Sequence, residues 1–337
     1  MKNNLSGTNT KMWNSELCKR TFSSAASWRE KKTMRIKVFD YTLEAIRNRK
    51  YPLIVDGNTQ EIALSLSDAA AGSLFFDHTH RPKAINEIPF DKKMVIEVVN
   101  SDCIDAAEEL LIATGTPPLV LNMASATHAG GGVENGAGAQ EENLCRRTDY
   151  VRFLFRYTPL ADSYGFLGID RDSRYSYPLD RWDGAVYSEG VTVFRGNEAD
   201  GYPFLEEPFR LDFVAVAALN LRRKEEYEWI KDKDGNYLLS ENEKEITCHK
   251  IRLMLRIAAQ TGHRTMVLSA FGCGAFSNPA REMATMFHQV LSEKEFCSAF
   301  DKIVFAILED HNSCSHINPE GNYKPFKSRF GEGVIRI

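Results

Sequence analysis

Residues 119–150 read LVLNMASATHAGGGVENGAGAQEENLCRRTDY, and the order of elements in this stretch decides how the rest of the chain is interpreted. An apolar strand at its start runs into a polar turn and then into three consecutive glycines, residues 130–132. Gln140-Glu141-Glu142 follows where a helix is expected to begin. A strand, a glycine loop and a helix in this order are typical of an α/β protein that binds its ligand at the end of a strand.

The three glycines predict a close approach of the backbone to an anion. Glycine has no Cβ and readily adopts a positive φ, so consecutive N–H groups can converge on a phosphate. We therefore expect Gly130, Gly131 and Gly132 to contact a ligand that carries a diphosphate. Taken alone, a glycine-rich loop after a strand is more often only a flexible connection.

The adjacent carboxylates Glu141 and Glu142 predict acid–base chemistry. Neighbouring acids repel and desolvate each other, which can raise the pKa of one of them into the range of a catalytic acid. The alternative is that both simply occupy the first turn of a helix, where acidic side chains are favoured. A diphosphate site beside such a pair suits a nucleotide-sugar ligand whose glycosidic bond is to be cut.

A second glycine loop is expected far downstream, at residues 267–279, which read VLSAFGCGAFSNP. The strand end is followed by Gly272 and Gly274, and Asn278-Pro279 has the character of an N-cap and first turn. A strand, a glycine turn and a helix N-terminus are the usual geometry for holding a phosphate. Phe276 is interpreted as a wall that stacks on a ribose, the alternative being a side chain that only fills the core.

The spacing of the GGG and QEE motifs resembles the signature of poly(ADP-ribose) glycohydrolases, in particular the microbial-type branch of that macrodomain family. The flanking LN-x-A-S and G-A-x-A-QEE-x-L-C-R patterns agree with it, and the G-C-G-x-F of the second loop is similar to the other phosphate loop of macrodomains. The resemblance covers roughly residues 34–330.

The resemblance implies a role for each motif residue. Glu142 matches the catalytic glutamate, Glu141 the neighbour that fixes ribose hydroxyls, and Gln140 the residue that orients the loop. Asp102 matches an aspartate that accepts a hydrogen bond from the adenine amino group, although it could equally be an ordinary helix N-cap. The other expected substrate contacts lie at a strand end and in the two loops: Asn122, Gly130, Gly131, Gly132, Gly272, Cys273, Gly274, Ala275 and Phe276. The scheme requires neither a cofactor nor a metal.

The chain departs from the family pattern beside the ribose nearest the scissile bond. His128-Ala129 stands where an Asn-Pro or similar pair is common, and Met123 where an aromatic residue is frequent. These changes leave the identity of the leaving group undetermined. Three activities remain: release of ADP-ribose from poly(ADP-ribose), removal of a single ADP-ribose from a protein side chain or nucleobase, and ADP-ribose binding without catalysis. The intact carboxylate pair argues against the last.

The alternation of strands and helices predicts a macrodomain-like three-layer α/β/α sandwich with a mixed central sheet and an N-terminal helical extension. Strands are expected at 94–100, 118–123, 213–219, 265–270 and 303–308. We expect a flexible arm over 1–33, a helical extension over 34–90, and the macrodomain over 91–337 with insertions near 155–212 and 222–245.

Composition limits the partners. A net charge of −4 over 337 residues argues against a broad basic surface for nucleic acid. The sequence contains no membrane-length apolar run and no signal peptide. Seven cysteines without CxxC pairs suit a reducing compartment, either the cytoplasm or a host cytosol reached without a Sec signal. His311, Cys314 and His316 lack a second ligand pair for a metal. The expected partners are ADP-ribose or poly(ADP-ribose) and ADP-ribosylated proteins.

Overall fold

The computed structural model describes residues 12–23, 26–85, 93–309 and 313–331. Its centre is a sheet of seven strands in the order β3-β6-β7-β5-β10-β11-β4. Strands β7, β5, β10, β11 and β4 are mutually parallel, whereas β6 is antiparallel to β7 and β3 is antiparallel to β6. The sheet strands are β3 (Ser73–Phe76), β4 (Val95–Val99), β5 (Leu119–Met123), β6 (Ala185–Arg195), β7 (Phe204–Val216), β10 (Thr265–Leu268) and β11 (Lys302–Ala306).

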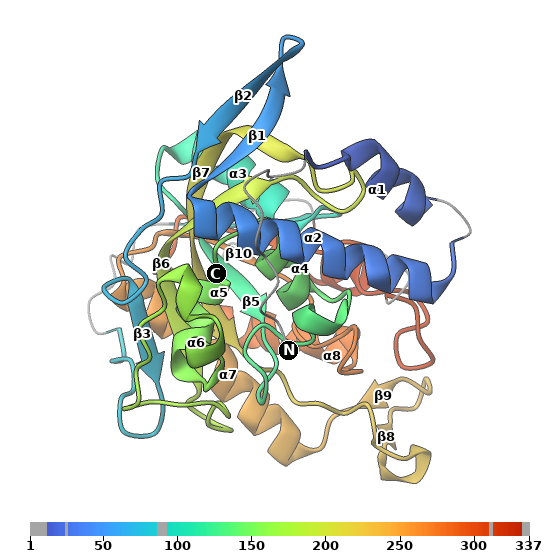
Figure 1. Cartoon of the computed structure of the whole chain (residues 1–337). Helices are drawn as coiled ribbons and strands as arrows, with labels where there is room; N and C mark the ends of the chain where they lie inside the picture. The colour runs from blue at the N-terminus through green and yellow to red at the C-terminus, as the bar shows by residue number, and fades with distance from the viewer. Residues whose placement is uncertain (1–11, 24–25, 86–92, 310–312, 332–337) are drawn as a thin grey trace.

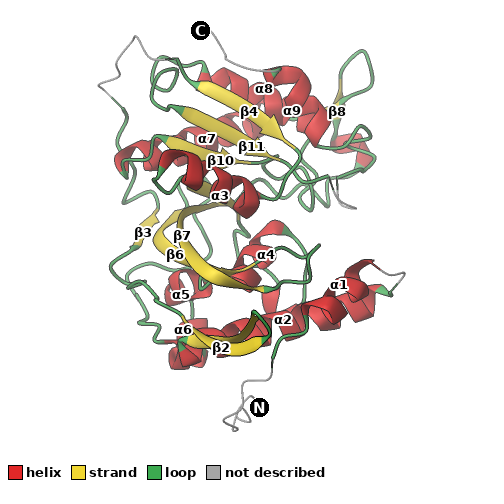
Figure 2. Cartoon of the chain, turned by 90° about the horizontal axis from the view of Figure 1, so that it is seen from above, coloured by secondary structure: helices red, strands yellow, loops and turns green. Residues whose placement is uncertain are grey.

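Helices cover both faces of this sheet (Figure 2). Successive residues of β5 alternate between two apolar clusters, with Val120 in one cluster and Leu119 and Leu121 in the other. The first cluster contains residues of α2 (Trp28–Asn48), α3 (Cys103–Thr114), α4 (Gln140–Arg147) and α5 (Val151–Leu154), and the second those of α7 (Glu241–Gln260), α8 (Ala280–Leu291) and α9 (Tyr323–Phe330). Because side chains alternate along a strand, a continuous apolar strand can serve both layers at once. The predicted mixed α/β class is confirmed.

The N-terminal region differs from the expected arm and helical extension. Helix α1 (Ser15–Ser23) packs on α2, which starts at Trp28 after a capping box formed by Ser27 and Glu30. Cys18 is fully buried there. Figure 1 shows α2 crossing the molecule in front of α4. Polar residues on the outer face of these helices give the segment the composition of an arm, but its few apolar side chains anchor it. Residues 1–11 of the expected arm lie outside the described residues.

The expected extension over residues 34–90 also contains strands. A hairpin of β1 (Lys50–Val55) and β2 (Asn58–Ala63) projects from the body (Figure 1), and β3 joins the central sheet as its edge strand. The residues expected as an insertion near 155–212 contain β6 and most of β7, together with the short helix α6 (Leu160–Ser163). The sheet is therefore assembled partly from the segments that sequence patterns assigned to additions around it.

Local sequence signals explain two further elements. Asp234-Gly235 forms the turn of the small hairpin of β8 (Ile230–Lys231) and β9 (Tyr237–Leu238), with φ of 82° at Gly235. Helix α7 begins with a capping box formed by Ser240 and Glu243. All seven cysteines are unpaired. None of the described helices is both long and apolar enough to cross a bilayer.

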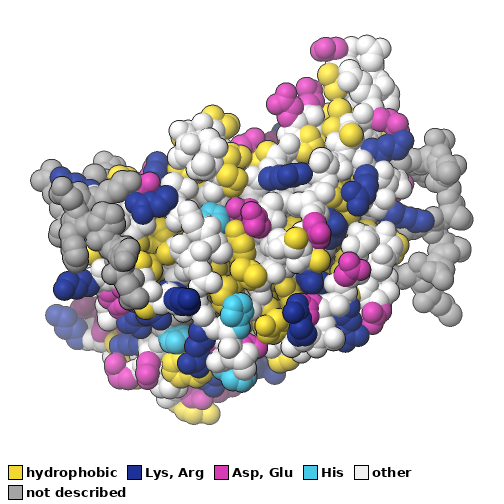
Figure 3. Space-filling view, turned by 90° about the vertical axis from the view of Figure 1, so that its left-hand side faces the viewer, with side chains coloured by type: hydrophobic (Ala, Val, Ile, Leu, Met, Phe, Trp, Pro, Cys, Tyr) yellow, Lys and Arg dark blue, Asp and Glu magenta, His cyan; other side chains and the backbone are white. Residues whose placement is uncertain are grey.

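The surface shows mixed charge on the face drawn in Figure 3, where Lys and Arg side chains alternate with Asp and Glu side chains. That face therefore carries no broad basic patch of the kind that binds nucleic acid. Among the described residues, no group of three or more His, Cys, Asp or Glu side chains is placed to hold a metal ion. His311 of the cluster considered in the sequence lies outside them.

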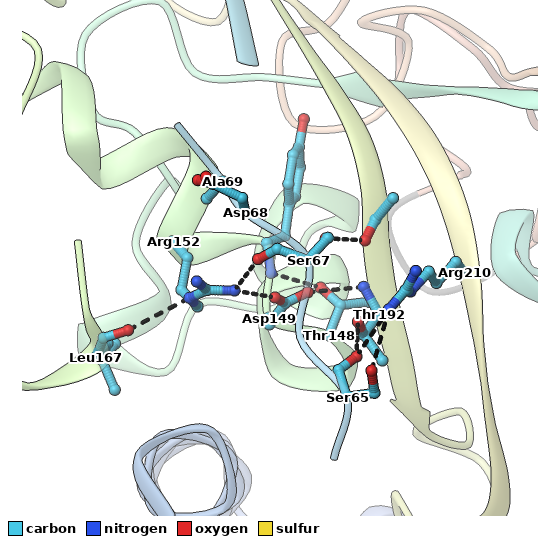
Figure 4. A network of polar contacts seen from close by, with 12 residues as sticks. Ser65, Ser67, Asp68, Ala69, Thr148, Asp149, Arg152, Leu167, Thr192 and Arg210 are labelled. Atoms are coloured by element: carbon cyan, nitrogen blue, oxygen red, sulfur yellow. Dashed lines mark hydrogen bonds and ion pairs between the residues drawn. The ribbon is translucent and has the colours of Figure 1, made fainter. Parts of the chain in front are cut away.

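A buried ion pair fastens the segment before β3 to the body (Figure 4). Arg152 donates to the Asp149 carboxylate at 2.9 Å and to the carbonyl oxygen of Ser67 at 3.0 Å, while Asp149 accepts the N–H of Thr192 at 2.7 Å. The side chains of Asp149 and Arg152 are 0% and 5% exposed. A charge pair so completely removed from water is strongly destabilised when one partner is lost, because the other charge remains buried.

We expect Asp149→Ala to lower the free energy of unfolding by about 3–5 kcal/mol, because Arg152 would be left buried without a counter-charge. The matched control is Asp162→Ala, since Asp162 pairs with Arg171 on the surface, with side chains 66% and 44% exposed. Such an exposed pair contributes about 1 kcal/mol at most. Urea unfolding of both variants measures the difference, and equal losses would contradict the role of the buried pair.

Candidate active site

The candidate site lies at the edge of the sheet where the parallel strands end. Asn122 is the second-last residue of β5, Asp102 follows the end of β4, and the second glycine loop follows β10. The carboxyl ends of parallel strands meet at one edge, so three segments far apart in the sequence converge there. The structure therefore places Asn122, Asp102 and the second glycine loop at the same edge of the sheet.

Gln140 ties the start of α4 to the end of β5. Its Oε1 accepts the N–H of Met123 at 2.8 Å, and its Nε2 donates to the carbonyl oxygen of Leu121 at 2.8 Å. These are the backbone groups that a neighbouring strand would otherwise use. Gln140 thereby fixes the two acidic residues that follow it relative to the sheet.

Glu141 is 3% exposed and is surrounded by N–H donors. Its Oε2 accepts the N–H of Ser125 at 2.7 Å, and its Oε1 accepts the N–H of Gly130 at 3.1 Å and the side-chain amide of Asn122 at 3.4 Å. Both carboxyl oxygens are therefore engaged by the protein itself.

Glu142 is 7% exposed and is held at one oxygen only. Its Oε1 accepts the N–H of Gly132 at 2.7 Å. Its Oε2 is buried and has no hydrogen-bond partner among the described residues. A buried carboxyl oxygen without a donor is energetically costly, and such groups concentrate at functional sites.

The first glycine loop serves the carboxylates. The N–H groups of Gly130 and Gly132 donate to Glu141 and Glu142, and that of Gly131 donates to the carbonyl oxygen of His128 at 2.9 Å. The sequence predicted that these N–H groups would contact the diphosphate of a ligand. In the structure, two of them contact carboxylates of the same chain, those of Glu141 and Glu142. His128 itself is exposed at the tip of the loop.

Gly131 shows why the position requires glycine. Its φ is 60°, and a Cβ there would collide with Oε1 of Glu142 and lie 3.1 Å from Oε2 of Glu141. The backbone thus lies directly against both carboxyl groups, and no other residue type leaves room for them.

The electrostatic state of the pair follows from its burial. Burial, together with the negative charge of Glu142, raises the pKa of Glu141 to about 8, although the donors Ser125, Asn122 and Gly130 act to lower it. Glu141 therefore retains a proton near neutral pH.

The second glycine loop has a different pattern of N–H groups. Gly272 has φ of 74° and lies close to the end of β7, where a Cβ would lie 2.5 Å from that of Ala218. Within the described part of the chain, the N–H groups of Gly274, Ala275 and Phe276 donate no hydrogen bond. Three consecutive N–H groups without partners in the described chain, at the end of a buried strand, are available to an anion.

The side chains of this loop differ in how far they are buried in the core. Cys273 is 1% exposed and packs in the second apolar cluster. Phe276 is half-buried and packs against that same cluster, which agrees in part with the core-filling alternative. Ala275 is exposed.

The helix start after this loop differs by one residue from the prediction. Pro279 occupies the N-cap and α8 begins at Ala280. The side chain of Asn278 donates to the carbonyl oxygens of Leu219 at 2.7 Å and of Gly272 at 3.1 Å, so it bridges two strand ends instead of capping the helix.

Asp102 is an N-cap in the structure. Its Oδ1 accepts the N–H of Ile104 at 2.8 Å and Nη1 of Arg147 at 2.6 Å. Its Oδ2 accepts only the amide of Asn143, at 3.3 Å. Asp102 therefore links α3 to α4, and Oδ2 is the oxygen with capacity left for a ligand.

Residues that the sequence motifs did not indicate support the site from behind. Arg35 of α2 pairs with Glu198 through two bonds of 2.8 Å and lies where a Cβ on Gly138 would be. The carbonyl oxygen of Lys32 occupies the corresponding place beside Gly136. Asn318 contacts the second loop from the C-terminal side. No local motif marks these residues, although the glycines that face α2 hint at a close neighbour.

Comparison with known proteins agrees with this geometry. Residues 40–196 match the family model described as microbial-type PARG, catalytic domain, a range that includes the first glycine loop and the carboxylate pair. No curated protein matches the chain significantly.

Solved structures match over most of the chain. A poly(ADP-ribose) glycohydrolase from Thermomonospora curvata bound to the inhibitor ADP-HPD is 27% identical with a TM-score of 0.64, and the match covers 88% of this chain and 98% of that one. A second structure of the glycohydrolase from the same organism is 26% identical with a TM-score of 0.65 over the same shares of both chains. The glycohydrolase from Deinococcus radiodurans in complex with ADP-ribose is 24% identical, covers 79% of this chain and 98% of that one, and has a TM-score of 0.57, which shows the shared fold.

The fold and the buried carboxylate pair thus define a glycosidase-type α/β protein. Residues 40–196 are similar to the catalytic domain of microbial-type poly(ADP-ribose) glycohydrolases, and most of the chain shares its fold with a bacterial glycohydrolase.

The raised pKa of Glu141 has a consequence for stability. Between its ordinary value of 4.5 and about 8, the folded protein keeps a proton that the unfolded chain releases. The contribution of Glu141 to the free energy of unfolding should therefore fall as pH rises through this window. We expect Glu141→Gln to gain stability relative to wild type between these pH values. Denaturant unfolding at a series of pH values measures the difference, and a difference that stays constant would contradict the assignment.

Proposed function

We propose that this chain is a poly(ADP-ribose) glycohydrolase that cleaves the glycosidic bond at the distal ribose and releases ADP-ribose, with Glu142 as its catalytic acid. The observation that carries this proposal is the asymmetry of the carboxylate pair. Both oxygens of Glu141 accept N–H donors, whereas Oε2 of Glu142 has no donor among the described residues. The family match and the ligands named for the related structures support the substrate class.

The asymmetry supports a division of roles within the pair. Oε2 of Glu142 accepts no N–H group from the described residues, so it is the oxygen of the pair that remains free to pass a proton to the substrate. Glu141 accepts N–H groups at both oxygens and is therefore a neighbour of fixed position. In this proposal Glu141 also contacts ribose hydroxyls and Gln140 orients the loop.

The second glycine loop is proposed to hold the diphosphate. Its three free N–H groups, from Gly274, Ala275 and Phe276, are donors without partners in the described chain. The N–H groups of Gly130 and Gly132 already donate to Glu141 and Glu142. The first loop is therefore proposed to contact the substrate mainly through van der Waals contacts of its backbone. Gly272 shapes the loop, and the buried Cys273 anchors it.

The remaining proposed contacts lie at the two ends of the ligand. Asp102 would accept the adenine amino group at Oδ2, in addition to capping α3. Phe276 would present the uncovered part of its ring to the distal ribose while the rest packs in the core. Asn122 would act through Glu141, to which it donates.

The proposed reaction uses one carboxyl group twice. Glu142 donates its proton to the departing glycosidic oxygen as the bond to the anomeric carbon breaks and positive charge develops on the ribose. Water then adds to that carbon, and the Glu142 carboxylate takes a proton from the water, which restores the acid. This differs from enzymes that place a separate acid on each side of the sugar. Positioning by the two loops is expected to supply most of the remaining rate enhancement.

The alternative within the same chemical class is removal of a single ADP-ribose from an acceptor. Met123 ends β5 and His128-Ala129 lie in the loop that follows, where the exposure of His128 leaves room for an acceptor. Incubating the protein with chain-modified and with singly modified substrates, and identifying the products, separates these activities. Release of ADP-ribose from chains supports the proposal, and activity only on single units would overturn it.

We expect Glu142→Gln to reduce kcat on poly(ADP-ribose) by at least about a hundredfold while ADP-ribose binding changes little, since acid–base catalysis typically contributes this much. The amide keeps an oxygen that can accept the N–H of Gly132 but cannot donate the proton that a carboxylic acid gives up.

The control for this variant is Glu134→Gln in the same loop region. Glu134 accepts the Tyr164 hydroxyl at 2.6 Å and is not part of the carboxylate pair. Its kcat should stay within about twofold of wild type, as expected for a site outside the reacting groups. Near-normal turnover by Glu142→Gln would instead contradict the assignment of Glu142 as the catalytic acid.

A further inference from the structure

One buried side chain outside the predicted motifs controls the geometry of the second glycine loop. Asn318 is 5% exposed and belongs to the segment between β11 and α9. Its Nδ2 donates to the carbonyl oxygens of Cys273 at 3.1 Å and Asn278 at 3.0 Å. Its Oδ1 accepts the N–H of Ala280, the first residue of α8, at 2.8 Å. Both donors of this amide therefore hold the loop, and its acceptor caps the helix that follows.

The segment that carries Asn318 is itself fixed to the sheet. The N–H of Asn318 donates to Oγ of Ser315 at 3.1 Å. Glu309, just beyond β11, accepts the N–H groups of Asn322 and Tyr323, at 2.7 Å and 2.5 Å. The N–H of Glu309 donates to the side chain of Asn100 at the end of β4, at 3.0 Å. The segment that carries Asn318 is thus tied to the ends of β11 and of the edge strand β4.

The bond to Cys273 acts on the neighbouring N–H group. The carbonyl of Cys273 and the N–H of Gly274 belong to one planar trans peptide unit, so they point in opposite directions. Gly274 tolerates a wide range of backbone angles, and a Cβ on it would meet nothing within 4 Å. Without the donor from Asn318, this peptide could rotate and replace the free N–H at the site by a carbonyl oxygen.

We propose that Asn318 is a positioning residue for substrate binding, which acts by keeping the N–H groups of Gly274, Ala275 and Phe276 directed at the diphosphate of the ligand. The inference rests on the proposed function of the loop. It predicts an effect on substrate affinity and not on the chemical step, because the carboxylate pair is held by a different loop.

Two substitutions separate the roles of the amide. Asn318→Asp keeps an oxygen for the N–H of Ala280 but replaces the donor by an oxygen that repels the carbonyls of Cys273 and Asn278. Asn318→Ala removes both functions. The control is Asn322→Ala, because Asn322 is a buried asparagine of the same segment whose side-chain oxygen has no hydrogen-bond partner among the described residues.

The experiment measures initial rates on poly(ADP-ribose), calorimetric binding of ADP-ribose and thermal unfolding for wild type and each variant. Asn318→Asp should raise KM and the Kd for ADP-ribose about tenfold or more, the size expected for losing two net hydrogen bonds. Its kcat should stay within about twofold, whereas a purely structural defect would lower the amount of active protein and leave KM unchanged. Asn322→Ala should leave both KM and Kd unchanged.

The outcomes separate this inference from the function on which it rests. Wild type that neither turns over poly(ADP-ribose) nor binds ADP-ribose would overturn the proposed function. Normal turnover by wild type with an unchanged KM and Kd in folded Asn318→Asp, or an equal rise in Asn322→Ala, would overturn the role of Asn318. If Asn318→Asp fails to fold, Ser315→Ala provides the same test, since it removes the acceptor that holds the backbone of Asn318 and should raise Kd in the same direction.

Discussion

The structure depends on the burial of two adjacent carboxyl groups against a glycine loop. Side by side, Glu141 and Glu142 repel each other, and each loses the hydration it would have in water. The N–H groups of Ser125, Gly130 and Gly132 replace part of that hydration. They can reach the carboxyl oxygens only because the backbone of the loop passes directly over them. The backbone N–H groups thus replace most of the hydration that the two carboxyl groups lose on burial. One oxygen of Glu142 receives no such donor from the described residues.

This constraint extends to the N-terminal helices. The loop between the glycines and α4 has α2 on its outer side, where the backbone of Lys32 and the guanidinium of Arg35 fill the places that side chains at Gly136 and Gly138 would take. Arg35 is in turn paired with Glu198, close to the end of β6. The N-terminal region is thus part of the construction of the site. Its helices hold the loop in place from behind while the carboxylates hold it from within.

The parts of the fold and site that sequence could predict are those with local signals. Continuous apolar strands, capping boxes and glycine turns mark β5, β10, α7 and both loops, and the residue pattern predicted that a helix begins at Gln140-Glu141-Glu142, where α4 starts. The partners of backbone groups were not predictable in the same way. Glycine N–H groups signal an anion, but whether it is a phosphate or the chain's own carboxylate depends on where α4 packs.

The elements missed from the sequence are held by contacts between distant residues. Residues 185–190 of β6 and 204–212 of β7 lie in a segment that looks like a polar insertion, and Asn318 reaches the second loop from about forty residues away. Within the expected arm, Ser15–Ser23 is helical because Cys18 and a few other apolar side chains find partners only in the folded body. Asp102 shows that two alternative predictions for one residue can both hold. It is the N-cap of α3, it forms an ion pair with Arg147 and, as proposed, it contacts the adenine.

The central claim is that the backbone of the first glycine loop positions the carboxylate pair, and Gly131→Ala tests it most directly. The new methyl group would collide with Glu142, whereas Gly168→Ala, with a similar φ of 70° and nothing within 4 Å, carries the backbone strain alone. We predict that turnover of poly(ADP-ribose) falls at least about a hundredfold in Gly131→Ala, as displacement of a reacting group by about 1 Å can produce, and stays near wild type in Gly168→Ala. Comparable activity in the two folded variants would contradict the account.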